Sequence, residues 1–157
     1  MKILFTLLLL TLSVNAASLA DLTYTTTDGK VTITDCVPGA AGELIIPTAI
    51  EDNPVTGIGS NAFQKCSSLT SVTIPSSVTS IGYAAFALCT SLTSVTIPSS
   101  VTSIAIAPFG RCTRLTSIIV EKGNVAYTSL DGVLFDIDQT KLIQYPAGKT
   151  GAYTIPD

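Results

Sequence analysis

The sequence predicts a β-rich solenoid, a stack of 23-residue units with a hairpin at each end. Residues 66–81 and 89–104 are the same sixteen residues apart from Ser67 and Thr90, at an offset of 23. Further positions recur at the same interval, which identifies the period of a repeat architecture. They are Phe63, Phe86 and Phe109; Cys66, Cys89 and Cys112; and Leu69, Leu92 and Leu115. Equivalent rungs of a stack meet equivalent neighbours, so they tolerate the same sequence.

The repeat unit reads L-x-x-V-x-I-P-x-x-V-x-x-I-G-x-x-A-F-x-x-C, and it opens with a short strand. Val72 and Ile74 alternate with polar residues, as in a half-buried strand, and Pro75 ends it by removing a ladder donor. In the segment "YAAFALC" the spacing of Phe86 and Cys89 predicts a short helical or 3₁₀ segment that buries both side chains.

The ends of the chain depart from the repeat, as the terminal units of a solenoid do. Residues 17–41 are expected to form an N-terminal hairpin cap, with the turn at Asp28-Gly29. The repeats occupy residues 42–120, where "LIIP" (44–47) aligns with "VTIP" (72–75) after allowance for insertions. Residues 121–157 are expected to form a hairpin insert, turning near 138–140, and the start of a further rung in "AYTIPD".

Residues 1–16 have the pattern of a secretory signal peptide. A basic start at Lys2 precedes an apolar run, which is too short to span a bilayer, and small residues follow. Cleavage after Ala16 and cleavage after Ala20 both fit the pattern. We therefore expect a secreted or cell-surface protein without a transmembrane segment.

The composition argues against several function classes. The net charge is −3, the pI is about 4.7 and only 12% of residues are charged, which disfavours nucleic acid and anionic membranes as partners. The chain has no histidine, so it lacks Ser-His and Cys-His pairs and histidine-based metal sites. We expect no catalytic residues, no cofactor and no metal site.

The repeat unit, in register three times, resembles the BspA-like leucine-rich repeat family. The stretch from Tyr127 to Gly148, Y-x-S-x-D-G-V-L-F…L-I-x-Y-P-x-G, is similar to a non-repeating insert found among these proteins. The resemblance covers about residues 22–157. It implies an exported leucine-rich solenoid, mostly microbial, with relatives linked to adhesion and to binding of partner proteins, and it carries no catalytic motif. Ala105, Pro108 and Glu121 depart from the family pattern, so the third rung is expected to be irregular on its convex side.

The four cysteines lie 30, 23 and 23 residues apart, which does not match the close pairs of a zinc site. One interpretation is that all four are small buried side chains at a tight turn. The alternative is one disulfide in an exported protein, such as Cys36 to Cys66, across the irregular first rung. The full set is Cys36, Cys66, Cys89 and Cys112.

The polar residues that alternate with the buried strand positions are the candidate partner-binding face. They are Ser71, Thr73, Ser94, Thr96 and Ser117. The favoured function is an exported, non-catalytic module for adhesion or for binding an extracellular protein, because solenoids present extended faces to partners. The main alternative is a structural spacer within a longer surface protein, in which serine and threonine serve only solubility and β structure. An enzyme and an ice-binding surface are remote alternatives.

Overall fold

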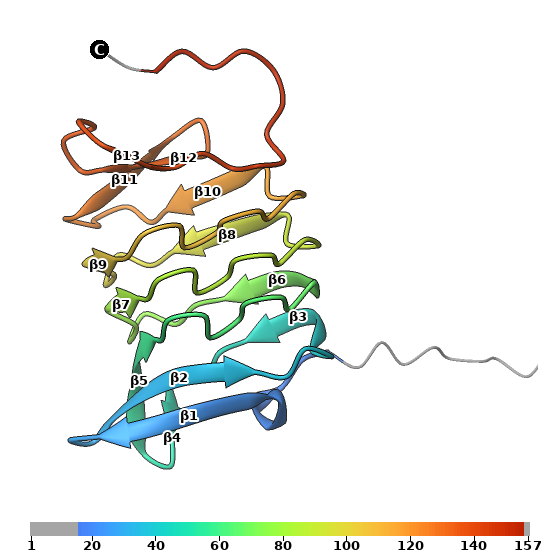
Figure 1. Ribbon diagram of the computed structural model, residues 1–157. Coiled ribbons are helices and arrows are strands. Elements are labelled where there is room, and N and C mark those ends of the chain that lie inside the picture. The colour runs from blue at the N-terminus through green and yellow to red at the C-terminus, as the bar shows by residue number, and fades with distance from the viewer. Residues whose placement is uncertain (1–15, 156–157) are drawn as a thin grey trace, which may run out of the picture.

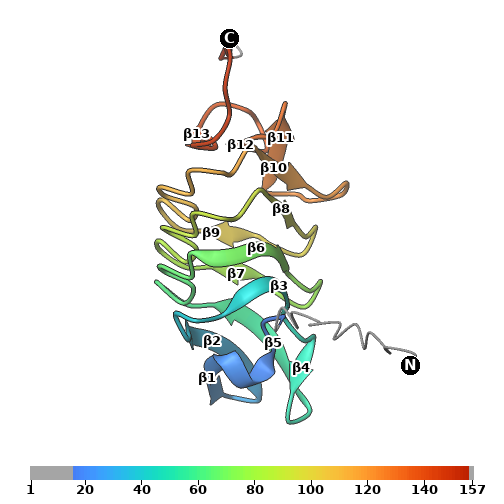
Figure 2. The same cartoon turned by 90° about the vertical axis from the view of Figure 1, so that its right-hand side faces the viewer.

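The computed structural model describes residues 16–155, which form an elongated stack of short strands and turns (Figure 1). Residues 1–15 of the expected signal peptide lie outside the described residues. Figure 2 shows the rungs lying one above another between the two terminal hairpins. The elements are η1 (Leu19–Asp21), β1 (Leu22–Thr27), β2 (Lys30–Cys36), β3 (Ala41–Ile45), β4 (Ala49–Ile50), β5 (Asn53–Ile58), β6 (Ser68–Thr73), β7 (Ser80–Ile81), β8 (Ser94–Ile97), β9 (Ser103–Ile104), β10 (Ser117–Val120), β11 (Tyr127–Leu130), β12 (Val133–Asp136) and β13 (Leu142–Gln144).

Two sides of the stack are parallel ladders of strands. On the first side β3 pairs with β6 and β8 pairs with β10, and Thr93 N donates to Thr70 O (3.4 Å) between the two pairs. On the second side β2, β5, β7 and β9 follow one another in parallel. Leu44 lies opposite Val72 and Ile58 opposite Ile81, so the alignment made through the insertions is confirmed.

The third side is made of turns, and here the expectation of a short helical segment is wrong. In "YAAFALC" the amides of Ala87 and Cys89 close two successive turns onto the carbonyls of Ala84 and Phe86. Ala84 and Leu88 adopt positive φ angles of 48° and 64°, which a helix excludes. The intervening amides point along the stack and bond the next rung. Hydrogen bonds between rungs therefore outweigh the local helical spacing.

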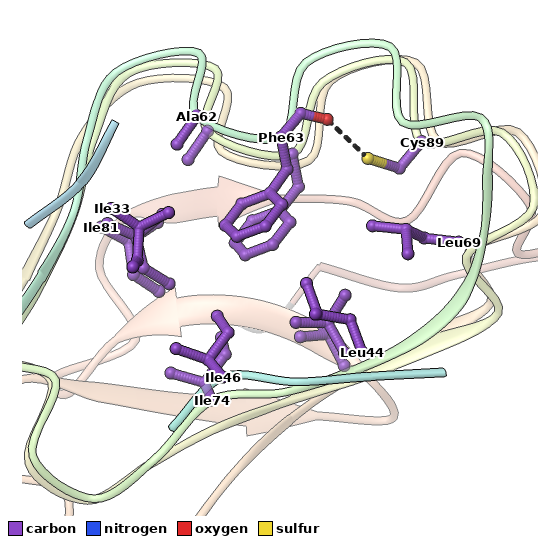
Figure 3. Packing of buried hydrophobic residues seen from close by; sticks show 14 of the residues in the cluster. Ile33, Leu44, Ile46, Ala62, Phe63, Leu69, Ile74, Ile81 and Cys89 are labelled. Carbon is purple, nitrogen blue, oxygen red and sulfur yellow. Dashed lines mark hydrogen bonds between the residues drawn. The ribbon is translucent and has the colours of Figure 1, made fainter. Parts of the chain in front are cut away.

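The core consists of the expected columns of identical or similar side chains, each buried between the three sides (Figure 3). The ring of Phe86 stacks on Phe63 with centroids 4.8 Å apart and on Phe109 with centroids 5.4 Å apart. Leu69, Leu92 and Leu115 are fully buried, and Val72, Val95 and Ile118 are at most 7% exposed. The predicted solenoid of stacked 23-residue units is thus confirmed.

The N-terminal hairpin caps the first rung. β1 and β2 are antiparallel around Asp28 and Gly29, both with positive φ, as a two-residue hairpin turn requires. β2 also continues the second ladder onto β5. The described chain begins before the hairpin, where Ala17 forms a parallel bridge to Leu44 and its amide donates to Ala41 O (2.9 Å).

The C-terminal insert is a three-stranded antiparallel sheet of β11, β12 and β13. Its turn between β12 and β13 contains residues 138–140, as expected. Asn124 fastens the segment before this sheet to the last rung. It is buried, its Nδ2 donates to Pro98 O (3.0 Å) and Val101 O (2.9 Å), and its Oδ1 accepts the amides of Ala126 and Tyr127.

The start of a further rung in "AYTIPD" stays a prediction. Residues 152–155 form no strand, and Tyr153 packs edge-to-face on Tyr145 with centroids 5.5 Å apart.

Candidate functional site

The outward side chains of β3, β6, β8 and β10 form one surface, which we call the strand face. Each strand contributes two of them, and the parallel register aligns these in two columns. Glu43 lies opposite Ser71 and Ile45 opposite Thr73, while Ser94 lies opposite Ser117 and Thr96 opposite Ile119. The first column is therefore Glu43, Ser71, Ser94 and Ser117, and the second is Ile45, Thr73, Thr96 and Ile119. Neighbouring strands in such a ladder lie ~4.8 Å apart.

All five residues proposed from the sequence lie on the strand face, but they differ in accessibility. Thr73, Ser94 and Thr96 are exposed, and Ser71 and Ser117 are half-buried. Ser117 is the most crowded, because the turn between β11 and β12 lies against it. A Cβ added at Gly132 would be 2.6 Å from Ser117 Oγ. The centre of the strand face is therefore Thr73 and Thr96.

The sequence interpretation missed two members of the strand face. Ile45 is 63% exposed at one end of the threonine column, and Glu43 is exposed at the end of the serine column. The signal was present, since the alignment of "LIIP" with "VTIP" puts Ile45 at the position of Thr73. Ile119, 48% exposed, ends the threonine column on the other side. Exposed isoleucines thus bracket two threonines in a single column.

The strand face is suited to contact rather than to chemistry. Among the side chains of its two columns, Glu43 is the one ionisable group. The columns contain no second acid or base that could act together with Glu43. The strand-face columns line none of the main cavities found over residues 16–155. A surface with hydroxyl groups and branched apolar side chains offers hydrogen bonds and van der Waals area to another protein.

The four cysteines form a buried column beside the phenylalanine column. Cys89 Sγ donates to Phe63 O (3.1 Å), and Cys112 Sγ repeats this bond to Phe86 O (3.0 Å) one rung further on (Figure 3). Cys36 shares the column, because Cys66 Sγ donates to its carbonyl (3.7 Å). All four are free thiols in the structure. The hydrogen bond with Cys66, together with burial, raises the pKa of Cys36. In the same way, the hydrogen bond with Cys112 and burial raise the pKa of Cys89. The buried thiols of Cys36 and Cys89 therefore stay protonated, and protonated thiols are poor nucleophiles.

Over the described residues 16–155, no group of three or more potential ligands is gathered in a way that would hold a metal ion. Within the same range, no helix has the length and apolarity that crossing a bilayer requires.

A family model described as "BspA type Leucine rich repeat region" matches residues 45–147, more than half of the chain, in 6 copies. Among solved structures, the T. pallidum leucine-rich repeat protein (TpLRR) is 30% identical, with a TM-score of 0.62. That match covers 66% of this chain and 49% of TpLRR, so the chain spans about half the length of that protein.

Two further solved structures are similar. A leucine-rich repeat protein from Bacteroides capillosus is 29% identical, with a TM-score of 0.49, and the match covers 64% of this chain and 94% of that one. The pneumococcal vaccine antigen PcpA is 21% identical, with a TM-score of 0.46, and the match covers 87% of this chain and 57% of that one. A comparison with curated proteins finds no match.

Proposed function

Because the chain belongs to the BspA-type leucine-rich repeat family, we propose that it is an exported, non-catalytic module that binds a protein partner through the strand face. One observation carries the proposal. The two outward columns stay in register within β3–β6 and within β8–β10, which the bond from Thr93 N to Thr70 O joins, with Thr73 and Thr96 at the centre and an exposed isoleucine at each end. Leucine-rich repeat proteins generally bind partners through extended faces of this kind.

The size and chemistry of the strand face bear on the strength of the interaction. Four strands at ~4.8 Å spacing make a surface roughly 14 Å wide across the strands. Strands of about four residues are ~13 Å long, so the area of the strand face is on the order of 200 Å², well below the ~800 Å² that each partner buries in a standard interface. The two isoleucines supply apolar contact, and the hydroxyl groups between them supply hydrogen bonds. A single copy should therefore bind weakly, and a display of several copies on a surface would strengthen adhesion by avidity.

A pair of charge-introducing variants tests the proposal. Thr73→Lys with Thr96→Lys places two ammonium groups at the centre of the strand face, on side chains that do not enter the core. The matched control, Gln64→Lys with Thr102→Lys, adds the same charge at exposed positions outside the strand face.

Both proteins should retain the wild-type circular dichroism spectrum and melting temperature. In a pull-down from extracellular proteins, the strand-face variant should lose the partners that the wild type and the control capture. Equal capture by all three proteins would reject the strand face as the binding surface. A wild type that captures nothing would favour a spacer within a longer surface protein.

Export is a second part of the proposal, and the fold favours one of the two cleavage sites predicted from the sequence. Ala17 is held by its bridge to Leu44 and its bond to Ala41 O. Ser18 is held by a bond from its amide to Asp21 Oδ2 (2.8 Å). Cleavage after Ala20 would remove both contacts, so we propose cleavage after Ala16.

The mature N-terminus of the secreted protein, determined by mass spectrometry, is therefore expected at Ala17. A terminus at Asp21 would contradict the choice of site. Secreted protein that retains Met1 would contradict cleavage altogether.

A further inference from the structure

The strand ladder on each of the first two sides of the stack has two ends, and three of these four ends are covered by other parts of the chain. On the first side, Ala17 bridges to β3, and the carbonyl of Gly132 accepts the amide of Ile118 in β10 (2.8 Å). On the second side, Tyr127 Oη accepts the amide of Ile104 in β9 (2.8 Å). The fourth end is β1, the outermost strand at the N-terminal end of the stack (Figure 1). Among the described strands, β2 is the one that pairs with β1.

The outer edge of β1 presents backbone hydrogen-bonding groups. The two-residue hairpin turn makes Thr27 and Lys30 a hydrogen-bonded pair, and pairs of this kind alternate with non-bonded pairs along an antiparallel ladder. The N–H and C=O groups of Tyr24 and Thr26 therefore point away from β2. In the part of the chain that the structure describes, no backbone hydrogen bond from another segment reaches these groups. Thr26 is exposed and Tyr24 is half-buried, so this edge is accessible.

β1 lacks most of the features with which proteins protect an exposed sheet edge. Such edges usually carry lysine, proline or a bulge, which discourage a further strand. The strand reads LTYTTT, without lysine or proline, and its one irregularity is the bulge between Thr23 and Tyr24. Thr23, Thr25 and Thr27 are exposed, and β-branched side chains suit pairing with another extended segment.

The charge of the chain is unevenly divided, and the end that carries β1 is acidic. Residues 16–53 contain six acidic residues and one basic residue, Lys30, which gives a formal net charge of −5. Residues 54–155 contain six basic and four acidic residues, which gives +2. An acidic surface attracts a positively charged partner and repels a negatively charged one.

Four of these acidic residues surround β1. Asp21 comes directly before the strand and Asp28 directly after it. Asp35 lies on β2, opposite the start of β1. Burial and the neighbouring carboxylate of Glu51 raise the pKa of Tyr24, which agrees with a position of Glu51 beside the strand. A further strand that pairs with β1 is therefore flanked by carboxylates.

We propose that the outer edge of β1 is a second binding site, separate from the strand face, for an extended segment of a partner protein that is rich in lysine or arginine. The segment adds as a further strand, and its N–H and C=O groups bond to those of Tyr24 and Thr26. Its basic side chains face Asp28 and Glu51. Addition of a strand to an exposed sheet edge is a recurrent mode of peptide recognition, in which backbone bonds give affinity and side chains give specificity.

Charge disfavours a second copy of the chain as the occupant. Two β1 strands that pair about a two-fold axis at Thr25 set Tyr24 of each copy opposite Thr26 of the other. The same arrangement brings Asp28 of each copy near Asp21 of the other. Like charges at both ends of the paired strands oppose it, whereas a segment with basic residues at these positions is attracted.

NMR with two synthetic peptides tests the site. The probe is a short peptide that alternates threonine and lysine, and the control peptide alternates threonine and glutamate. The basic peptide should shift the amide resonances of Tyr24 and Thr26 and slow their exchange with solvent, because these amides become paired. The acidic peptide should do neither. Added salt should weaken binding of the basic peptide, since the surrounding carboxylates are exposed to solvent.

Two substitutions separate backbone pairing from charge. Thr26→Pro removes one outward N–H and should abolish binding of the basic peptide. The pairing of β1 with β2 should remain, because proline is tolerated on an edge strand where the N–H faces solvent. Glu51→Lys should weaken binding by about fivefold, the equivalent of ~1 kcal/mol. The matched control, Asp138→Lys, makes the same change of charge at an exposed position on the C-terminal hairpin and should leave binding unchanged.

If Thr26→Pro alters the circular dichroism spectrum, the comparison of Glu51→Lys with Asp138→Lys decides, since neither substitution changes the strand. Three outcomes would overturn the proposal. They are equal binding of the two peptides, equal binding by the Glu51→Lys and Asp138→Lys variants, and protection of the Tyr24 and Thr26 amides in the free protein. Protection that grows with protein concentration would assign the edge to a second copy of the chain.

Discussion

The stacked phenylalanine column allows the energy of rung-to-rung contact to be measured directly. Phe86 lies between two other rings, with interplanar angles of 3° to Phe63 and 16° to Phe109. Phe63 stacks on one ring of this column, that of Phe86. Ile33 and Ile58 belong to the neighbouring column. Replacing phenylalanine with leucine keeps a large apolar side chain in the core and removes the ring contacts.

An aromatic pair contributes about 0.5–1.5 kcal/mol beyond the area that it buries. Phe86→Leu breaks two such pairs and should cost about 1–3 kcal/mol in free energy of unfolding. Phe63→Leu breaks one and should cost about half as much. Truncation by Phe86→Ala adds the cavity term and should reach about 3–5 kcal/mol.

Urea unfolding followed by circular dichroism measures these differences, provided that the denaturant slope m is unchanged between variants. Tyr83→Leu is the control, because its side chain is 53% exposed in the same turn and its change should stay within ~0.5 kcal/mol. Equal costs for Phe86→Leu and Phe63→Leu would refute the view that ring stacking couples the rungs.

Two further predictions follow from close contacts. Gly82→Ala should destabilise the protein by about 1–3 kcal/mol, because the added Cβ would lie 2.5 Å from Ser60 N and 2.6 Å from Gly59 C in the rung below. Gly39→Ala is the control, because the added Cβ meets nothing within 4 Å, and it should leave the melting temperature nearly unchanged. Equal losses of stability in the two variants would contradict the close contact at Gly82. Hydrogen bonds from Lys141 N (2.9 Å) and Thr140 Oγ1 (2.8 Å) lower the pKa of Asp136 below its ordinary value. The stability that this carboxylate contributes is therefore present at neutral pH and is lost as pH falls through the lowered pKa. Asp136→Asn should remove that part of the acid sensitivity, and an NMR titration of Asp136 that shows an ordinary or raised pKa would contradict it.

Much of the fold follows from the sequence because the repeat is nearly exact. Sixteen residues repeated at an offset of 23 require equivalent surroundings, and only stacking provides them. The columns that contain Phe86, Leu92 and Val95 could be identified from spacing alone, because residues at the same position of successive units belong to the same column. The N-terminal hairpin could be identified from Asp28-Gly29, whose φ preferences are local, and the C-terminal hairpin from the two β-rich runs on either side of residues 138–140.

The tertiary structure decided the features that depend on contacts between rungs. The spacing of Phe86 and Cys89 is compatible with a helical turn, and no local rule reveals that the amide of Phe86 bonds to Pro108, 22 residues away. The register across strands placed Glu43 opposite Ser71, on the strand face. A propensity describes one residue in its own segment, whereas a hydrogen bond between rungs is set by two segments together.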